Sequence, residues 1–178
     1  MSFFVRMLER QKWEKNNLSE LGYSKTPADT ITGDLRTVSN NLSLWSIETI
    51  DRLHDAILAL AVMRNKLTRL DVLIIEKNKI EEKGLEVLNT PENGKTPLIG
   101  FEEFHYDLID LNYDKLGDFS QIIIESVIDE ELCIRFPKGE ISKILYDGFQ
   151  DKKFSLEELD DGLKEELEKV IARRKSLE

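Results

Sequence analysis

The chain of 178 residues is poor in the residue types that build disulfides and most metal sites. Its single cysteine, Cys133, cannot form an intramolecular disulfide, which is typical of a protein in a reducing compartment. Neither of its two histidines, His54 and His105, has another histidine or a cysteine at ligand spacing, so we expect no metal site. The apolar start, residues 3–8, is short and interrupted by Arg6. It therefore argues against a signal peptide or a membrane span and favours a cytoplasmic location.

Glycine-rich phosphate-binding motifs are also missing. The nine glycines are scattered, and none of them forms Gly-x-Gly-x-x-Gly or a complete phosphate loop. Gly94-Lys95-Thr96 matches only the end of such a loop, because Asn89 stands where its first glycine belongs and Pro97 blocks a following helix. A Gly-x-Ser-x-Gly nucleophile motif is absent as well. We therefore expect no nucleotide and no other cofactor.

The composition is that of a folded, acidic protein. Hydrophobic residues make up 40% of the chain and charged residues 34%, which is enough to build a core and a well-solvated surface. Thirty-five acidic side chains exceed 25 basic ones, for a formal net charge of -10. Such a surface repels nucleic acids and anionic membranes and attracts basic partners. We expect neither nucleic acid nor membrane as a partner.

The first half of the sequence mixes strand and helix patterns. An apolar run over residues 3–8 predicts a strand. Thr26-Pro27 is a typical helix start and Gly33 a typical helix end, so a short helix is predicted between them. Residues 35–47 predict a β-hairpin with an asparagine-containing turn. The continuous apolar run at 71–75 predicts a central strand that is covered on both faces.

The strongest helical signal spans residues 49–67. Apolar residues recur there at helical spacing, and the stretch 56–63 is apolar on all sides. A helix of this kind is either wedged between two layers of its own protein or buried in an interface between copies of the chain. The sequence leaves both possibilities open.

The second half begins after a loop at 89–97, which is also a possible internal boundary of the single domain 1–178. Residues 118–136 are compatible with a helix or a strand, and we favour a helix. A serine cap and a leucine stripe predict a further helix over 155–171. The predicted fold class is α+β, with an N-terminal antiparallel sheet, a long buried helix and a mostly helical C-terminal half.

Residues 101–131 contain ten acidic side chains and one lysine, almost the whole negative excess of the chain. We expect a non-enzymatic binding protein that docks a basic protein partner through this segment, as an inhibitor, an antitoxin or an immunity protein does. The alternative is that the acids are spread around several helices and that Trp45 is simply a core residue. The candidate binding residues are Glu103, Phe104, Tyr106, Asp107 and Asp110, together with Arg36, Asn40 and Trp45 of the hairpin.

Two other functions stay open. Glu102, His105, Asp107 and Asp110 could form a general acid–base or hard-cation site of a small enzyme, although a solvated acidic face is the commoner arrangement. Helix 49–67 could instead assemble the chain into a homo-oligomer, which would make the protein a structural subunit.

Overall fold

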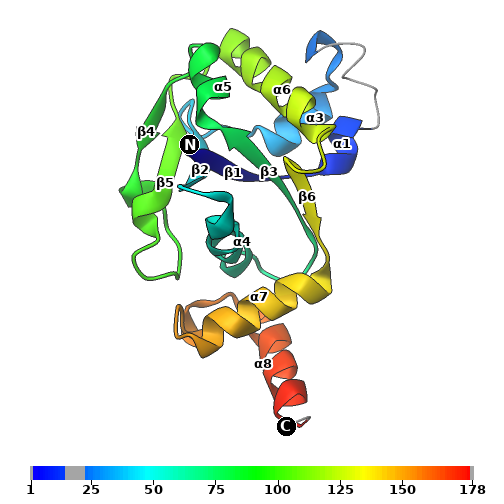
Figure 1. Ribbon diagram of the computed structural model, residues 1–178, viewed down its shortest axis with the longest axis vertical. Helices are drawn as coiled ribbons and strands as arrows, with labels where there is room; N and C mark the ends of the chain where they lie inside the picture. The colour runs from blue at the N-terminus through cyan, green and yellow to red at the C-terminus, as the bar shows by residue number, and fades with distance from the viewer. Residues whose placement is uncertain (1, 15–22, 177–178) are drawn as a thin grey trace.

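A computed structural model describes residues 2–14 and 23–176, and these form a six-stranded antiparallel sheet with helices on both faces (Figure 1). The strand order is β4-β5-β2-β1-β3-β6. Four strands precede the loop at 89–97 and two follow it, so the sheet joins both halves of the chain. The strands are β1 (Phe3–Leu8), β2 (Leu42–Ile47), β3 (Leu70–Glu76), β4 (Val87–Asn89), β5 (His105–Leu108) and β6 (Cys133–Phe136).

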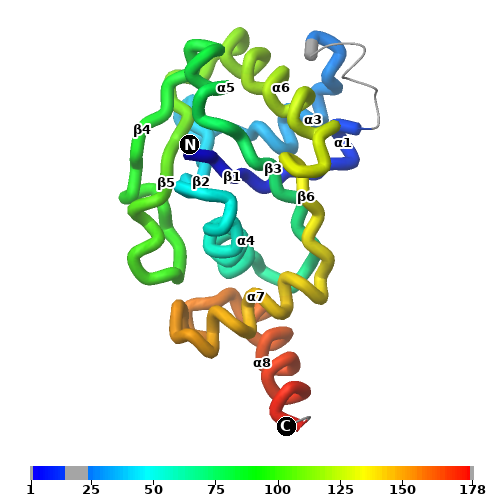
Figure 2. The backbone as a smooth tube through the Cα atoms, viewed as in Figure 1, coloured from blue at the N-terminus to red at the C-terminus, as the bar shows by residue number. Residues whose placement is uncertain are grey.

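The helices divide between the two faces of the sheet. Helices α4, α7 and α8 belong to one face, and Figure 2 shows α7 and α8 at the opposite end of the molecule from α6. Helices α1, α3, α5 and α6 lie on the other face. The helices are α1 (Arg10–Glu14), α3 (Ala28–Asp34), α4 (Leu53–Val62), α5 (Lys77–Glu82), α6 (Tyr113–Val127), α7 (Lys138–Gln150) and α8 (Asp161–Lys175).

Strand β3 is the centre of the core, as its apolar sequence predicts. Val72 and Ile74 point to the α4 face, whereas Leu73 and Ile75 point to the α6 face, and all four are fully buried. The strand pairs with β1 on one side and β6 on the other. A strand with neighbours on every side needs apolar residues at every position, which is why its pattern does not alternate.

Helix α4 is shorter than the predicted helix. A 3₁₀ turn at Ile50–Arg52 precedes it, and it ends at Val62 rather than at residue 67. The chain itself supplies the second layer that the apolar stretch requires, because α4 packs between the sheet and α7. Leu58 lies so close to Gly148 of α7 that a Cβ at Gly148 would come within 2.7 Å of the leucine Cδ2. Seven of the ten residues of α4 are therefore buried by the chain itself.

The α+β fold class is confirmed, and three local expectations need correction or completion. Residues 35–38 form no strand; they contribute only an isolated bridge between Val38 and Asn41. Strand β2 pairs with β1 and β5 instead, so the predicted hairpin is wrong. The segment 118–136 contains both a helix and a strand, α6 and β6. The second half is mostly helical, as predicted, but the sheet is not confined to the N-terminal half, since β5 and β6 belong to it.

The predicted helix over 155–171 is interrupted, although its serine cap and its leucine stripe are both present. Ser155 and Glu158 form the capping box of a 3₁₀ turn at Leu156–Glu158, and α8 then begins after a second cap, Asp160. The leucine stripe of α8 is buried against α7. Among the described residues, we find no helix that is long and apolar enough to cross a membrane.

Candidate functional site

Five polar residues meet around the carboxylate of Asp107 and are called the polar cluster here: Ser43, Thr90, Asn93, His105 and Asp107. Both carboxylate oxygens accept hydrogen bonds, from the Thr90 hydroxyl at 2.9 Å, the Asn93 amide at 2.9 Å and the Ser43 hydroxyl at 3.2 Å. His105 Nδ1 lies 3.0 Å from the main-chain oxygen of Thr90. Because a carbonyl can only accept, Nδ1 carries the proton. His105 and Asp107 are almost completely buried.

The register between β2 and β5 and the close approach of Gly94 bring these residues together. On β5, His105 stands opposite Trp45 and Asp107 opposite Ser43, so both side chains point to the same face of the sheet. The turn that carries Thr90 and Asn93 then closes over them. A Cβ at Gly94 would lie 2.5 Å from the His105 Cβ, so only glycine allows this close approach.

The structure does not gather the four residues of the predicted acid–base site. His105 and Asp107 are joined through Thr90, but Asp110 is exposed, in a left-handed conformation with φ of 53°, and Glu102 lies on the 3₁₀ turn Glu102–Phe104. In residues 2–14 and 23–176, no three His, Cys, Asp or Glu side chains are placed to hold a metal ion. Cys133 is buried, and burial raises the pKa of its thiol to about 11, so it is not a nucleophile at neutral pH.

The candidate aromatic residues pack mainly against one another. Trp45 is buried, with its ring 5.2 Å from Phe101 and 5.1 Å from His105. Phe104 is half-buried beside Phe101. Tyr106 points to the opposite face of the sheet, where it meets Phe4. Trp45 is therefore a core residue, as its alternative interpretation held.

The acids of 101–131 are spread over several elements. Glu103 is exposed on the 3₁₀ turn before β5, Asp107 is buried, and other acids lie along α6 and in the turn after it. One exposed aromatic residue stands among them. Tyr113, the first residue of α6, is 89% exposed; the exposed Asp114 follows it directly, and the exposed Asp110 stands three residues before it. We call Asp110, Tyr113 and Asp114 the acidic patch.

A second feature, which the sequence did not reveal, is a cleft beside the polar cluster. Strands β1 and β2 pair only from Phe3 to Val5 of β1, and then separate, whereas β1 continues along β3 to Leu8. Arg6 enters the gap. Three adjoining cavities of about 440, 560 and 510 Å³ share Arg6 in their linings, and together we call them the arginine cleft.

Arg6 is held by main-chain oxygens rather than by a carboxylate. Its two terminal nitrogens donate to the carbonyls of Ser43 and Asp34, each at 2.6 Å, while its Nε is enclosed without a partner in the described part of the chain. Burial lowers the pKa of Arg6 to about 10, although the nearby Asp34 carboxylate partly offsets the effect. The guanidinium is therefore still charged at neutral pH, and its charge is only partly compensated.

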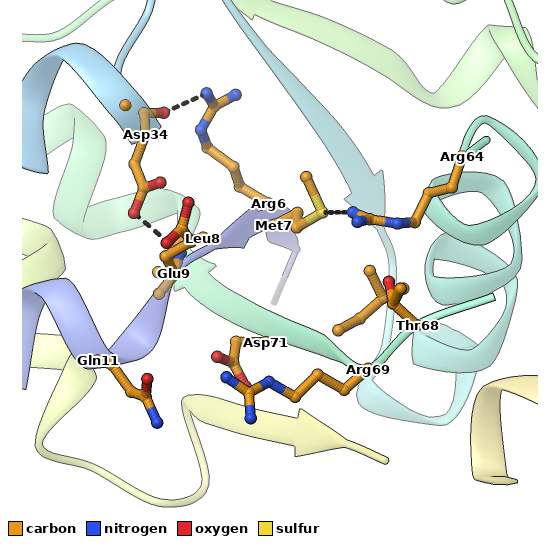
Figure 3. A pocket seen from close by; sticks show the side chains of 12 residues that line it. Arg6, Met7, Leu8, Glu9, Gln11, Asp34, Arg64, Thr68, Arg69 and Asp71 are labelled. Carbon is orange, nitrogen blue, oxygen red and sulfur yellow. Dashed lines mark hydrogen bonds between the residues drawn. The ribbon is translucent and has the colours of Figure 1, made fainter. Parts of the chain in front are cut away.

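Arg64 reaches the cleft from the segment after α4 (Figure 3). Its Nη1 lies 2.8 Å from the sulfur of Met7, which is a weak acceptor, and its buried Nε has no partner among the described residues. The buried hydroxyl of Thr68 also lacks a partner there. Arg69 lies beside these groups in the same cavity. Two buried donors on this wall of the cleft, Arg64 Nε and the Thr68 hydroxyl, therefore lack a partner among the described residues.

The cationic side chains that line the cleft have no ion-pair partner in the described structure. Four of the nine arginines of the chain, Arg6, Arg36, Arg64 and Arg69, line it with Lys95, and none of the five forms an ion pair in the described structure. The carboxylates that line it all have internal partners. They are Glu9 with Lys12, Asp34 with Trp13, Asp71 with Arg135, and Asp107 in the polar cluster.

The remaining two hairpin candidates do not lie together as predicted. Arg36 is exposed and lines the cleft, whereas the exposed Asn40 has φ of 63° and its main-chain oxygen accepts a hydrogen bond from Leu111 N at 2.9 Å.

One sequence signal could have indicated the cleft. Arg6 interrupts an otherwise apolar strand, and a charge inside a buried strand requires a special environment.

Comparison with known proteins gives no family to which the chain can be assigned: no family model, no curated protein and no solved structure matches it. The function therefore has to be argued from the sites themselves.

Proposed function

We propose that this chain is a non-enzymatic binding protein that docks a basic protein partner, in the manner of an inhibitor, an antitoxin or an immunity protein. The observation that carries the proposal is Tyr113. A large aromatic side chain that is 89% exposed, with two exposed acids within three residues of it, is typical of a binding hot spot, because tyrosine supplies apolar contact area and a hydroxyl together.

The charge of the protein supports the same partner. The net charge of -10 attracts a basic protein from a distance, and the exposed Asp110 and Asp114 can form ion pairs around the tyrosine. We centre the proposed surface on Tyr113 rather than on Asp107. Asp107 is buried with all its hydrogen bonds made inside the protein, so it cannot meet a partner directly.

The two alternative functions receive less support. A small enzyme would need its acid and base exposed to a substrate, but His105 and Asp107 are buried and bonded to Thr90. Assembly through helix 49–67 was motivated by an apolar face in need of cover, and the sheet and α7 already cover α4.

A photo-crosslinking amino acid in place of Tyr113 tests the proposal in the source cell. The expected product is a crosslink to one basic protein, absent when the same amino acid replaces the exposed Glu168 of α8. With that partner purified, the association rate should fall at least about tenfold between low and high salt, because salt screens charges beyond about 8–10 Å.

Charge reversal supplies the matched control. The pair Asp110→Lys and Asp114→Lys should slow association, whereas Glu165→Lys and Glu168→Lys on α8, with the same change in net charge, should have a smaller effect. Equal effects of the two pairs, or an association rate that does not depend on salt, would contradict docking at the acidic patch.

A further inference from the structure

We propose that the arginine cleft binds a small organic molecule with a dianionic oxyanion head, such as a phosphate monoester, on an apolar body. The head lies between Arg6 and Arg64 near Thr68, and the body covers the wall formed by Met63 and Trp45. This site is independent of the acidic patch, because Asp110, Tyr113 and Asp114 do not line the cleft.

The case for an oxyanion begins with the donors. The Nε atoms of Arg6 and Arg64 and the hydroxyl of Thr68 are enclosed and have no hydrogen-bond partner among the described residues. An unpaired buried donor lowers stability, and the three residues that carry these donors line one cavity, so a group bound there would lie beside side chains whose hydrogen bonds are incomplete. Phosphate oxygens accept bidentate hydrogen bonds from guanidinium groups and accept from hydroxyls.

Arg135, whose partner Asp71 lines the cleft, provides an internal comparison. Arg135 donates two hydrogen bonds to the Asp71 carboxylate, from Nε at 2.6 Å and from Nη2 at 3.0 Å, and so forms a bidentate ion pair. Arg64 faces the Met7 sulfur instead, and Arg6 faces two main-chain carbonyls. The protein thus pairs an arginine with a carboxylate where the bond is structural, and leaves Arg6 and Arg64 without one at the cleft. Two or three guanidinium groups, counting Arg69, match a doubly charged head better than a singly charged one.

The case for an apolar body comes from one of the three cavities, the one lined by Trp45 and Met63. It measures about 560 Å³, within the range of roughly 300–1,000 Å³ that small-molecule sites occupy. Val5, Trp45, Leu60 and Met63 line it, with Arg6 and Arg64 at the same cavity. Met63 is 53% exposed, and an apolar ligand would cover its flexible side chain.

The net charge limits the size of the ligand. A nucleic acid would bring many phosphates against a protein of charge -10, whereas the cleft gathers Arg6, Arg64 and Arg69 at one cavity. A small molecule places its charge at the cleft alone. Phenyl phosphate is a suitable probe, because it combines the head with an aromatic body and is mainly dianionic above a pH of about 6.

Calorimetric titration of the full chain with phenyl phosphate, at constant ionic strength and slightly alkaline pH, tests the assignment. We expect one saturable site with a Kd below about 1 mM. Inorganic phosphate, which has no body, and phenylacetate, which has a singly charged head, should each bind about tenfold more weakly. Trp45 fluorescence should change with phenyl phosphate, since the residue lines the cavity.

Arg64→Met should weaken binding of phenyl phosphate at least about tenfold, because a hydrogen bond to a charged group is lost. The melting temperature of this variant should equal that of the unchanged protein, since the Arg64 side chain makes one hydrogen bond in the described structure, to the Met7 sulfur, which is a weak acceptor. Arg173→Met, at an exposed arginine of α8, is the matched control and should bind normally. The assignment is overturned by absence of saturable binding up to about 10 mM, by equal affinity of the two variants, or by equal affinity for phenylacetate.

Discussion

The polar cluster and the arginine cleft lie side by side, and their charged groups are satisfied in opposite ways. In the polar cluster, the Asp107 carboxylate accepts three hydrogen bonds and every partner belongs to the protein. In the cleft, Arg6 and Arg64 keep an enclosed Nε without a partner in the described chain. His105, Asn93 and Ser43 belong to the cluster and also line the cleft, so the two regions share a wall.

This difference indicates that the polar cluster stabilises the fold, whereas the cleft is suited to binding a ligand. A buried polar group whose bonds are all internal stabilises one arrangement of the chain, because any opening leaves its partners unsatisfied. A group whose bonds are incomplete costs stability and gains it back only when a ligand binds. The three predictions below test whether the cluster is structural and the cleft is not, from the largest expected effect to the smallest.

Removal of the Asp107 carboxylate should give the largest effect. Asp107→Ala leaves the Thr90, Asn93 and Ser43 donors without their acceptor, and should lower the free energy of unfolding by about 3–5 kcal/mol. Urea unfolding measures it. The exposed Glu125→Ala serves as control, with an expected change within about 0.5 kcal/mol. A loss below about 1 kcal/mol for Asp107→Ala would show that the cluster is not structural.

A pair of leucines on α4 compares core and cleft. Leu58 is 3% exposed and packs on Gly148, so Leu58→Ala should cost about 2–4 kcal/mol. Leu60 is only half-buried and lines the cleft, so Leu60→Ala should cost about 1 kcal/mol. Unfolding in urea again gives both values. If the two losses were equal, Leu60 would be as much a core residue as Leu58, and the cleft would be closed in solution.

Divalent cations should have the smallest effect. An ion that binds the native state raises the melting temperature, but Asp107 already has three hydrogen-bond partners and Asp110 lies apart from it. Thermal melts with and without magnesium, manganese or calcium should therefore agree, both for the unchanged protein and for His105→Ala. A shift of several degrees that His105→Ala abolishes would restore the enzyme hypothesis.

Strong local patterns carried most of the correct predictions. The apolar run at 71–75 and the capping box at Ser155 were recognised because each signal lies within its own segment, whereas the β-branched residues of 118–136 left that segment open between a helix and a strand. Strand β5 was missed because it is only four residues long. The hairpin at 35–47 was mistaken because its turn residues, Ser39 and Asn40, have positive φ, as predicted, but lead into a bridge rather than a ladder.

At the candidate site, too, the local sequence pattern did not determine which residues are buried. Alternation places His105 and Asp107 on one face of a strand, and a polar face normally points to solvent. Here the turn at residues 90–94 covers that face, so residues predicted to meet a partner became buried. Exposed and buried versions of such a strand have the same sequence pattern. Only contacts between segments distant in sequence distinguish them.

The sequence by itself determined the α+β class, the central strand β3, the helices with strong periodicity and the excess of acidic charge, because propensity, capping and net charge act within a segment or over the whole chain. The tertiary structure alone decided which charges are paired. Arg6 and Arg64 are 58 positions apart, and β1 must separate from β2 before both can reach one cleft. Burial and pairing depend on such distant neighbours, and the order of residues does not encode them locally.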